Sequence, residues 1–242
     1  MTCPDHPAPM STFPRYAIYY ASAQGCTLDR FGAEMLGYDA WIGAALPFPD
    51  SVVEKVPDWR ELSEEPRKYG FHATLKAPIS LANGESESDL LAACADFAEQ
   101  KRPIPVIEPV VSSISGFIAV IPETPSDELE LLAAECVRAF DSFRAPLSAE
   151  DRARRNPHKL TPRQVEYLDR WGYPYVMEEY RFHMTLTGRL SETRREELLA
   201  MLRARFARLG LRQLEIDRIA LFRQADPSAR FAIIGAWPLR AA

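Results

Sequence analysis

The feature of this sequence that most constrains its fold is a heptapeptide that occurs twice. The two copies read YGFHATL at 69–75 and YRFHMTL at 180–186, agree at five of seven positions and lie 111 residues apart. In both copies the histidine and threonine alternate with apolar neighbours at a period of two, which is typical of a β-strand. A motif repeated at such an offset predicts that the chain folds as two similar halves.

The elements predicted outside the repeat also favour a duplication. Segments rich in aromatic and β-branched residues alternate with segments whose apolar residues follow helical spacing. The predicted strands cover 15–22, 70–76, 104–114, 117–121, 180–187, 213–224 and 230–238. The predicted helices cover 28–36, 85–100, 127–143, 162–171 and 192–209, and 47–66 is interpreted as a long loop. This order predicts a mixed α+β fold.

The repeat brings two kinds of polar side chain onto one face of each strand. Successive side chains of a strand point to opposite faces, so His72 and Thr74 share one face, and so do His183 and Thr185. The apolar residues between them anchor the other face. If the two halves pack about a pseudo-twofold axis, the two His-x-Thr pairs face each other across one cleft.

Two imidazoles and two hydroxyls in one cleft are suited to phosphoryl chemistry. A neutral imidazole takes a proton from an attacking hydroxyl or water, and a protonated imidazole gives one to the departing oxygen. The threonine hydroxyls hydrogen-bond the nonbridging phosphoryl oxygens. A single His-x-Thr is common and carries little information, whereas two copies in the same frame favour a catalytic interpretation.

Three further residues are candidate substrate contacts. Lys76 lies two positions after Thr74 and Arg181 two positions before His183, so the same period places both cations on the face of the motifs. Tyr20, in the predicted first strand, is the third candidate, with packing in the core as its alternative.

The sequence predicts neither a metal site nor a cofactor. Each half offers one histidine without an adjacent carboxylate, and metal ligation needs more ligands converging on the ion. The remaining histidines are His6 and His158. The cysteines, at positions 3, 26, 94 and 136, have the spacing of neither a zinc site nor a disulfide framework. We therefore expect a reducing, cytoplasmic environment.

Charge narrows the class of partner. The chain has 29 Lys and Arg against 34 Asp and Glu, a net charge of -5. An acidic protein is a poor fit for a long RNA or an anionic membrane surface, so a small phosphorylated substrate is expected, with RNA ends less favoured. No apolar stretch is long enough to cross a bilayer.

The predicted domain organisation is simple. Residues 1–12, with three prolines, are interpreted as a flexible tail, and residues 13–242 as one bilobal domain with lobes at roughly 13–114 and 115–242. The segment 145–174 is unusual because five cations gather between positions 152 and 163, and this cluster is either a solvated surface or a flap over the cleft. Those cations are Arg152, Arg154, Arg155, Lys159 and Arg163.

At these residues the chain resembles the two-histidine (2H) phosphoesterase superfamily, which is defined by paired His-x-Thr/Ser motifs. The resemblance extends over nearly the whole chain from Phe13 onward. RYAIYY at 15–20 and the two heptapeptides, continued to Lys76 and Gly188, are similar to a bacterial branch whose genes often accompany phosphonate-utilisation operons. The resemblance implies a duplicated, bilobal α+β fold with two antiparallel sheets lining a central cleft and helices on the outer faces.

Members of that superfamily open or form cyclic phosphodiesters. The resemblance therefore implies that His72 and His183 are the acid/base pair and that Thr74 and Thr185 hold the phosphate. It also implies that the segment 145–174 is an enlargement relative to the smallest members, at the rim of the cleft.

Together these features predict a metal-independent phosphodiesterase that hydrolyses a small cyclic phosphate, carried by a ribose or a nucleotide. Two other classes stay open. One is a noncatalytic binding module or sensor for phosphorylated metabolites or RNA ends. The other is a metal-dependent hydrolase that uses His72, His183 and His158. The oligomeric state, the physiological substrate and the identity of the base are not predicted.

Overall fold

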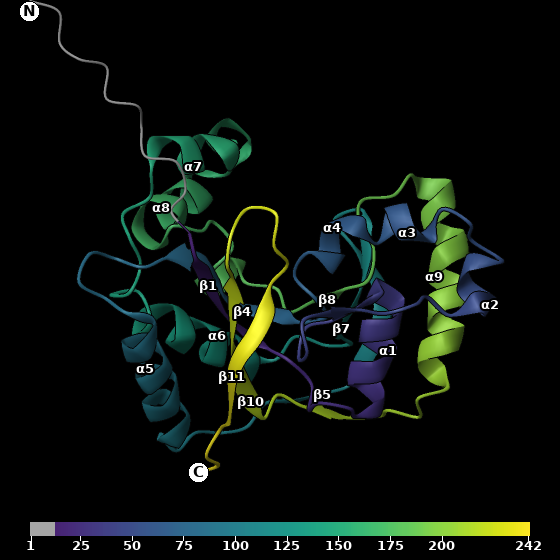
Figure 1. The fold of residues 1–242 in the computed structure, drawn as a ribbon, viewed down its shortest axis with the longest axis horizontal. Helices are drawn as coiled ribbons and strands as arrows, with labels where there is room; N and C mark the ends of the chain where they lie inside the picture. Colours follow the sequence, from purple (N-terminus) through teal and green to yellow (C-terminus); the bar gives the residue numbers. More distant parts are fainter. Residues whose placement is uncertain (1–12) are drawn as a thin grey trace, which may run out of the picture.

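The protein is an α+β molecule built on one seven-stranded antiparallel sheet (Figure 1). The structure is a computed structural model that describes residues 13–242, so the tail expected at 1–12 lies outside the described residues. The strands follow the order β11-β10-β1-β4-β8-β7-β6. They are β1 (Arg15–Tyr20), β4 (Ala73–Ser80), β6 (Pro109–Ile114), β7 (Phe117–Pro122), β8 (Met184–Thr185), β10 (Arg218–Gln224) and β11 (Ala232–Pro238). Two small ribbons pair β2 (Tyr38–Asp39) with β3 (Ala44–Ala45) and β5 (Val106–Ile107) with β9 (Leu214–Glu215).

The sheet has two parts that meet at a single residue pair. The strands β11, β10, β1 and β4 form one part and β8, β7 and β6 the other, and only Ala73 of β4 pairs with Met184 of β8 between them. The expected α+β class is confirmed, and the two antiparallel sheets expected from the resemblance are the two parts of this one hydrogen-bonded sheet.

The lobe boundaries expected at 13–114 and 115–242 do not coincide with these two parts. The C-terminal strands β10 and β11 lie beside β1 and β4, while β6, from the first half of the chain, pairs with β7 in the other part. The reason is that antiparallel neighbours are chosen by packing over long sequence separations, whereas lobes were expected from consecutive segments.

Helices flank both parts of the sheet. The long helices are α1 (Thr27–Leu36), α5 (Glu87–Glu99), α6 (Asp127–Ala139), α8 (Pro162–Trp171) and α9 (Glu192–Ala207). Four short ones are α2 (Asp50–Val53), α3 (Trp59–Leu62), α4 (Glu64–Arg67) and α7 (Ala149–Arg154), and 3₁₀ turns cover Pro157–Lys159 and Met177–Glu179. In Figure 1, α5 and α6 lie on one side of the molecule and α1 and α9 on the other. Helix α6 packs on β4, α5 on β10 and β11, and α9 on β6 and β7.

The helices begin where their capping residues predict. Ser86 starts α5 with a capping box completed by Asp89, and Thr161 starts α8 with one completed by Gln164. Gly172 ends α8 with a φ of 73°, a conformation that favours glycine. None of the helices in residues 13–242 is both long enough and apolar enough to cross a membrane.

The strand expected at 180–187 is regular only at Met184–Thr185. The residues before it nevertheless keep the alternation of a strand. Phe182 and Met184 are buried, whereas His183 and Thr185 are half-buried. Its short ladder, two pairs to β7 and one to β4, explains why so little of the segment is regular strand.

Candidate active site

The two His-x-Thr motifs lie side by side at the line where the two parts of the sheet meet. Ala73 and Met184, the central residues of the motifs, are directly opposite each other and have no exposed surface. This antiparallel register, continued by one residue each way, sets His72 against Thr185 and Thr74 against His183. Cross-strand neighbours have Cβ atoms about 4.5–5.5 Å apart. The four side chains therefore form a twofold-related quartet on one face of the sheet.

His72 is held by three contacts. Its Nδ1 donates to the carbonyl oxygen of Gly70 at 2.9 Å, so Nε2 is the nitrogen left for chemistry. The Tyr19 ring stacks on the imidazole with centroids 3.9 Å apart and an interplanar angle of 21°. Thr74 Oγ1 lies 3.4 Å from Nε2. The ring is thus fixed with one free nitrogen next to the motif hydroxyl.

His183 repeats this arrangement in the other part of the sheet. Its Nδ1 donates to the carbonyl oxygen of Arg181 at 2.7 Å, again two residues before the histidine. The Phe117 ring lies beside the imidazole, with centroids 5.5 Å apart and a tilt of 53°. Each histidine therefore has an Nδ1 bound to its own backbone, a free Nε2 and an aromatic neighbour, which is the orientation that a proton-transferring pair needs.

Both imidazoles favour the neutral form. Burial lowers the pKa of His72 to about 4, against the opposing hydrogen bond to Gly70, and the nearby positive form of His183 lowers it further. Burial also lowers the pKa of His183, with the hydrogen bond to Arg181 opposing it. The electrostatic effect of His183 on His72 shows that the two rings lie close enough for their protonation to be linked. A strongly lowered pKa makes His72 a base at neutral pH.

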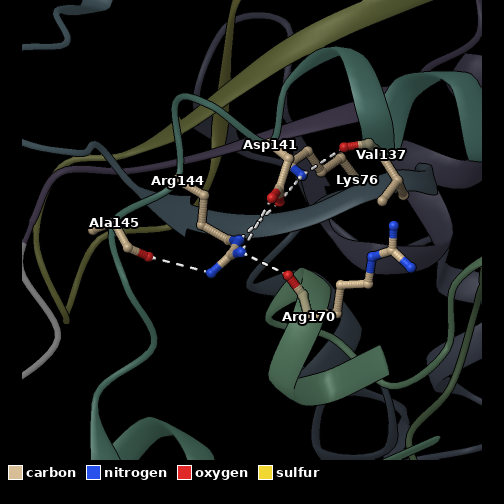
Figure 2. A network of polar contacts seen from close by, with 6 residues as sticks. All are labelled: Lys76, Val137, Asp141, Arg144, Ala145 and Arg170. Atoms are coloured by element: carbon tan, nitrogen blue, oxygen red, sulfur yellow. Dashed lines mark hydrogen bonds and ion pairs between the residues drawn. The ribbon is translucent and has the colours of Figure 1, made fainter. Parts of the chain in front are cut away.

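The structure contradicts the placement of Lys76 on the face of the motifs. Thr74 lies opposite Tyr19, but Lys76 lies opposite Ile18, the preceding residue of β1, because the β1–β4 register shifts there. The ammonium of Lys76 is buried and donates to the Val137 carbonyl at 3.0 Å and to Asp141 Oδ1 at 3.1 Å (Figure 2). It is a structural cation that anchors β4 to α6.

Tyr20 is also wrongly predicted as a substrate contact. It is 2% exposed, its ring packs in the main core near Phe182, and its hydroxyl donates to the carbonyl of Glu215 at 3.2 Å. The adjacent Tyr19 occupies the face of the motifs instead. Tyr19 is the residue of β1 that pairs with Thr74, so it lies on the same face of the sheet as the motif. This can be predicted only when the register between β1 and β4 is known.

Arg181 has a different role from the one expected. Its carbonyl oxygen holds His183, while its side chain is exposed. A contact between its guanidinium and a bound phosphate stays a prediction.

The segment 145–174 contains the helices α7 and α8 and packs on α6. Its helix α8 packs through Tyr167 onto Val137 of α6 and onto Val176, and Tyr167 donates to Glu178. An ion pair between Arg152 and Asp169 joins α7 to α8. Arg144, at the start of the segment, donates to Asp141 and, at 3.0 Å, to the Arg170 carbonyl (Figure 2). These contacts attach it to α6 beside the edge of β4.

The fold is the α+β class that the sequence predicts, and the two His-x-Thr motifs lie on adjacent strands. A family model described as "Protein of unknown function (DUF1045)" matches residues 74–232, more than half of the chain, and the protein belongs to this family. The match includes the whole of the second His-x-Thr motif and the threonine of the first.

Two curated relatives carry the same name, "Ribose 1,5-bisphosphate phosphokinase PhnN". The one from Janthinobacterium sp. (strain Marseille) is 34% identical over 227 residues, which cover 90% of this chain and 49% of the relative. The one from Laribacter hongkongensis (strain HLHK9) is 31% identical over 220 residues, with coverages of 90% and 50%. The chain thus spans about half the length of these relatives.

Solved structures with a similar arrangement of elements have low sequence identity. One described as a phosphoesterase is 12% identical with a TM-score of 0.39, covering 94% of this chain and 98% of that chain. Escherichia coli LigT in complex with NADP+ is 11% identical with a TM-score of 0.38, with coverages of 94% and 99%.

Proposed function

We propose that the protein is a metal-independent phosphodiesterase that opens a small cyclic phosphate by general acid–base catalysis. The observation that supports this function is the twofold quartet, in which two imidazoles with free Nε2 atoms alternate with two threonine hydroxyls. Two proton-transferring groups around one bound phosphate meet the needs of in-line displacement without a further group. A binding site alone needs no pair of oriented imidazoles.

In this proposal His72 is the base and His183 the acid. Nε2 of His72 takes a proton from water while the water oxygen bonds to phosphorus. The bond from phosphorus to one ring oxygen breaks, and that oxygen receives the Nε2 proton of His183. The products are a phosphate monoester and a free hydroxyl. The charge of the bound phosphodiester raises the pKa of the imidazole next to it, so binding favours the protonated acid. Thr74 and Thr185 hydrogen-bond the nonbridging oxygens.

The substrate we propose is a ribose cyclic phosphate or a related small nucleotide. The curated relatives are named for a kinase of ribose 1,5-bisphosphate, a ribose with two phosphate monoesters. Opening a cyclic phosphate on a ribose yields a monoester of this chemical kind. The printed sequence has no Gly-Lys pair, so it lacks the P-loop by which many kinases hold nucleotide phosphates, and we propose no kinase activity for it.

Chelation tests the metal-independent part of the proposal. Within residues 13–242, no three His, Cys, Asp or Glu side chains gather in a way that could hold a metal ion. Hydrolysis of adenosine 2′,3′-cyclic phosphate is therefore expected to continue at an unchanged rate after dialysis against excess EDTA. Loss of activity that zinc or manganese restores would identify a metal-dependent hydrolase instead, and binding without any product would identify a sensor.

The pH dependence is expected to be bell-shaped and to lie on the acid side of neutrality. The base must be neutral, so kcat/KM falls as the pH drops through about 4, where His72 of the free enzyme gains its proton. The acid must be protonated, and the pKa of His183 is lowered from 6.5, so the alkaline limb lies below that value. Because the two imidazoles titrate together, both limbs of the pH profile report apparent pKa values of the pair and not of either histidine alone. A plateau that extends above pH 7 in kcat/KM would contradict this assignment.

A further inference from the structure

A cavity lies near the quartet, between β4 and the segment 145–174. Its volume is about 640 Å³, within the range of small-molecule sites. Residues of β4 form one wall, and the opposite wall comes from α7 and from Tyr173 and Val176, which follow α8. The His-x-Thr residues do not line this cavity.

The lining of this cavity is strongly basic in a protein of net charge -5. Six cations and one carboxylate, Asp151, line it; the cations are Arg15, Lys68, Lys76, Arg144, Arg154 and Arg155. Three of the six have carboxylate partners, because Lys76 and Arg144 bind Asp141 and Arg154 binds Asp151. Within residues 13–242, Arg15, Lys68 and Arg155 form no ion pair with a carboxylate.

The three remaining cations come from separate elements and are brought together here. The guanidinium of Arg15, at the start of β1, is held by Gln224 Oε1 at 3.0 Å and by the Phe231 ring at 5.7 Å. Arg155 lies 5.0 Å from the centre of the Tyr173 ring. Burial lowers the pKa of Arg15, and the charges of Arg154 and Arg155 lower it further, so these guanidinium groups repel one another. A bound anion relieves that repulsion.

Tyr69 connects this cavity to the candidate active site. It lines the cavity, and its ring centre is 6.1 Å from that of His72. Tyr19, which stacks on His72, is close enough to Arg15, Arg155 and Tyr173 for their charges to influence its pKa. Tyr69 therefore lies between the quartet and the cavity that the cations line.

We propose that this cavity binds a phosphate monoester of the substrate, held by Arg15, Lys68 and Arg155, and that the substrate therefore carries two phosphate groups. Three uncompensated cations match the charge and the several oxygens of a monoester, and guanidinium groups bind such oxygens in pairs. One phosphate lies at the quartet and the other in the cavity. The inference rests on the proposed function for the first phosphate, and its binding test stands independently of turnover.

Calorimetric titration of the full chain tests the cavity without catalysis. Ribose 5-phosphate is expected to bind at low ionic strength and ribose is not. Arg155→Gln should weaken binding of ribose 5-phosphate by about tenfold, since a charged hydrogen bond contributes about that factor. The matched control is Arg152→Gln, three positions earlier in α7, outside the cavity and paired with Asp169. Equal affinities for Arg155→Gln and the unaltered protein would overturn the proposal.

A second measurement relates the cavity to turnover. Adenosine 2′,3′-cyclic phosphate with a 5′-phosphate is expected to have at least a tenfold lower KM than the same compound without one. Arg155→Gln should remove this difference between the two compounds. If ribose 5-phosphate binds through Arg155 but neither compound is hydrolysed, the cavity proposal stands and the proposed function fails. If both are hydrolysed with equal KM, the proposed function stands and the cavity proposal fails.

Discussion

Replacing His183 with alanine is expected to lower kcat for a cyclic phosphodiester by about 10²–10⁴-fold, the range for loss of a positioned acid or base. The imidazole is fixed by its Nδ1–H bond to the Arg181 carbonyl, so in the proposed mechanism Nε2 protonates the departing oxygen. The side chain is half-buried at the edge of the core, so the fold should tolerate its loss. Initial rates at saturating substrate measure the effect, with circular dichroism as the check on folding.

The other histidines make this experiment selective. His72→Ala should give a loss of similar size, and the double variant should be little worse than either single one, because the pair acts as a unit. The control is His158→Ala, since His158 is exposed in the 3₁₀ turn Pro157–Lys159 and takes no part in the quartet. An unchanged rate for His183→Ala, or a loss for His158→Ala equal to that for His72→Ala, would refute the assignment.

Replacing Asp141 with alanine is expected to lower the free energy of unfolding by about 3 kcal/mol, the lower end of the range for breaking a buried ion pair. The Lys76 side chain is 3% exposed, and without Asp141 its ammonium keeps only the Val137 carbonyl. The Asp141 side chain is 23% exposed, which limits the cost. Urea denaturation, followed by tryptophan fluorescence and circular dichroism, measures the loss.

A double variant separates the uncompensated charge from the lost contacts. Asp141→Ala combined with Lys76→Met should recover most of the stability, because methionine fills the same space without a charge. The control is Asp169→Ala, which breaks the exposed pair with Arg152 and should cost less than about 1 kcal/mol. Equal losses for Asp141→Ala and the double variant would show that the charge of Lys76 is not the cause.

The repeated heptapeptide predicted the quartet because the features that define it lie within one short segment of the chain. A histidine, a threonine and their apolar neighbours define one face of a strand wherever that strand lies, and the burial of Ala73 and Met184 matches that expectation. The pairing of the two strands follows from the similarity of the two copies. Most helices were predicted for the same reason, because capping residues and apolar spacing are read within one segment.

The incorrect predictions concern residues whose position depends on the register between two strands. Counting by twos from His72 placed Lys76 in the site, but the pairing between β1 and β4 shifts at this point, and the ammonium of Lys76 binds Val137 and Asp141. The same register decides that Tyr19, rather than Tyr20, faces His72. Such bulges depend on two strands at once, as does the position of β10 and β11 beside β1, so neither is visible in a single segment.

The near-twofold symmetry of the quartet has a consequence for regiochemistry. In the proposed mechanism His183 protonates whichever ester oxygen lies beside it, so the motifs alone give no preference for which bond of a bound phosphodiester breaks. The surroundings are unequal, because a stacked tyrosine covers His72, a tilted phenylalanine borders His183 and the helical wall of α7 and α8 stands on one side only. We therefore expect residues that transfer no proton to set the orientation of a bound cyclic phosphate, and with it the choice of leaving oxygen.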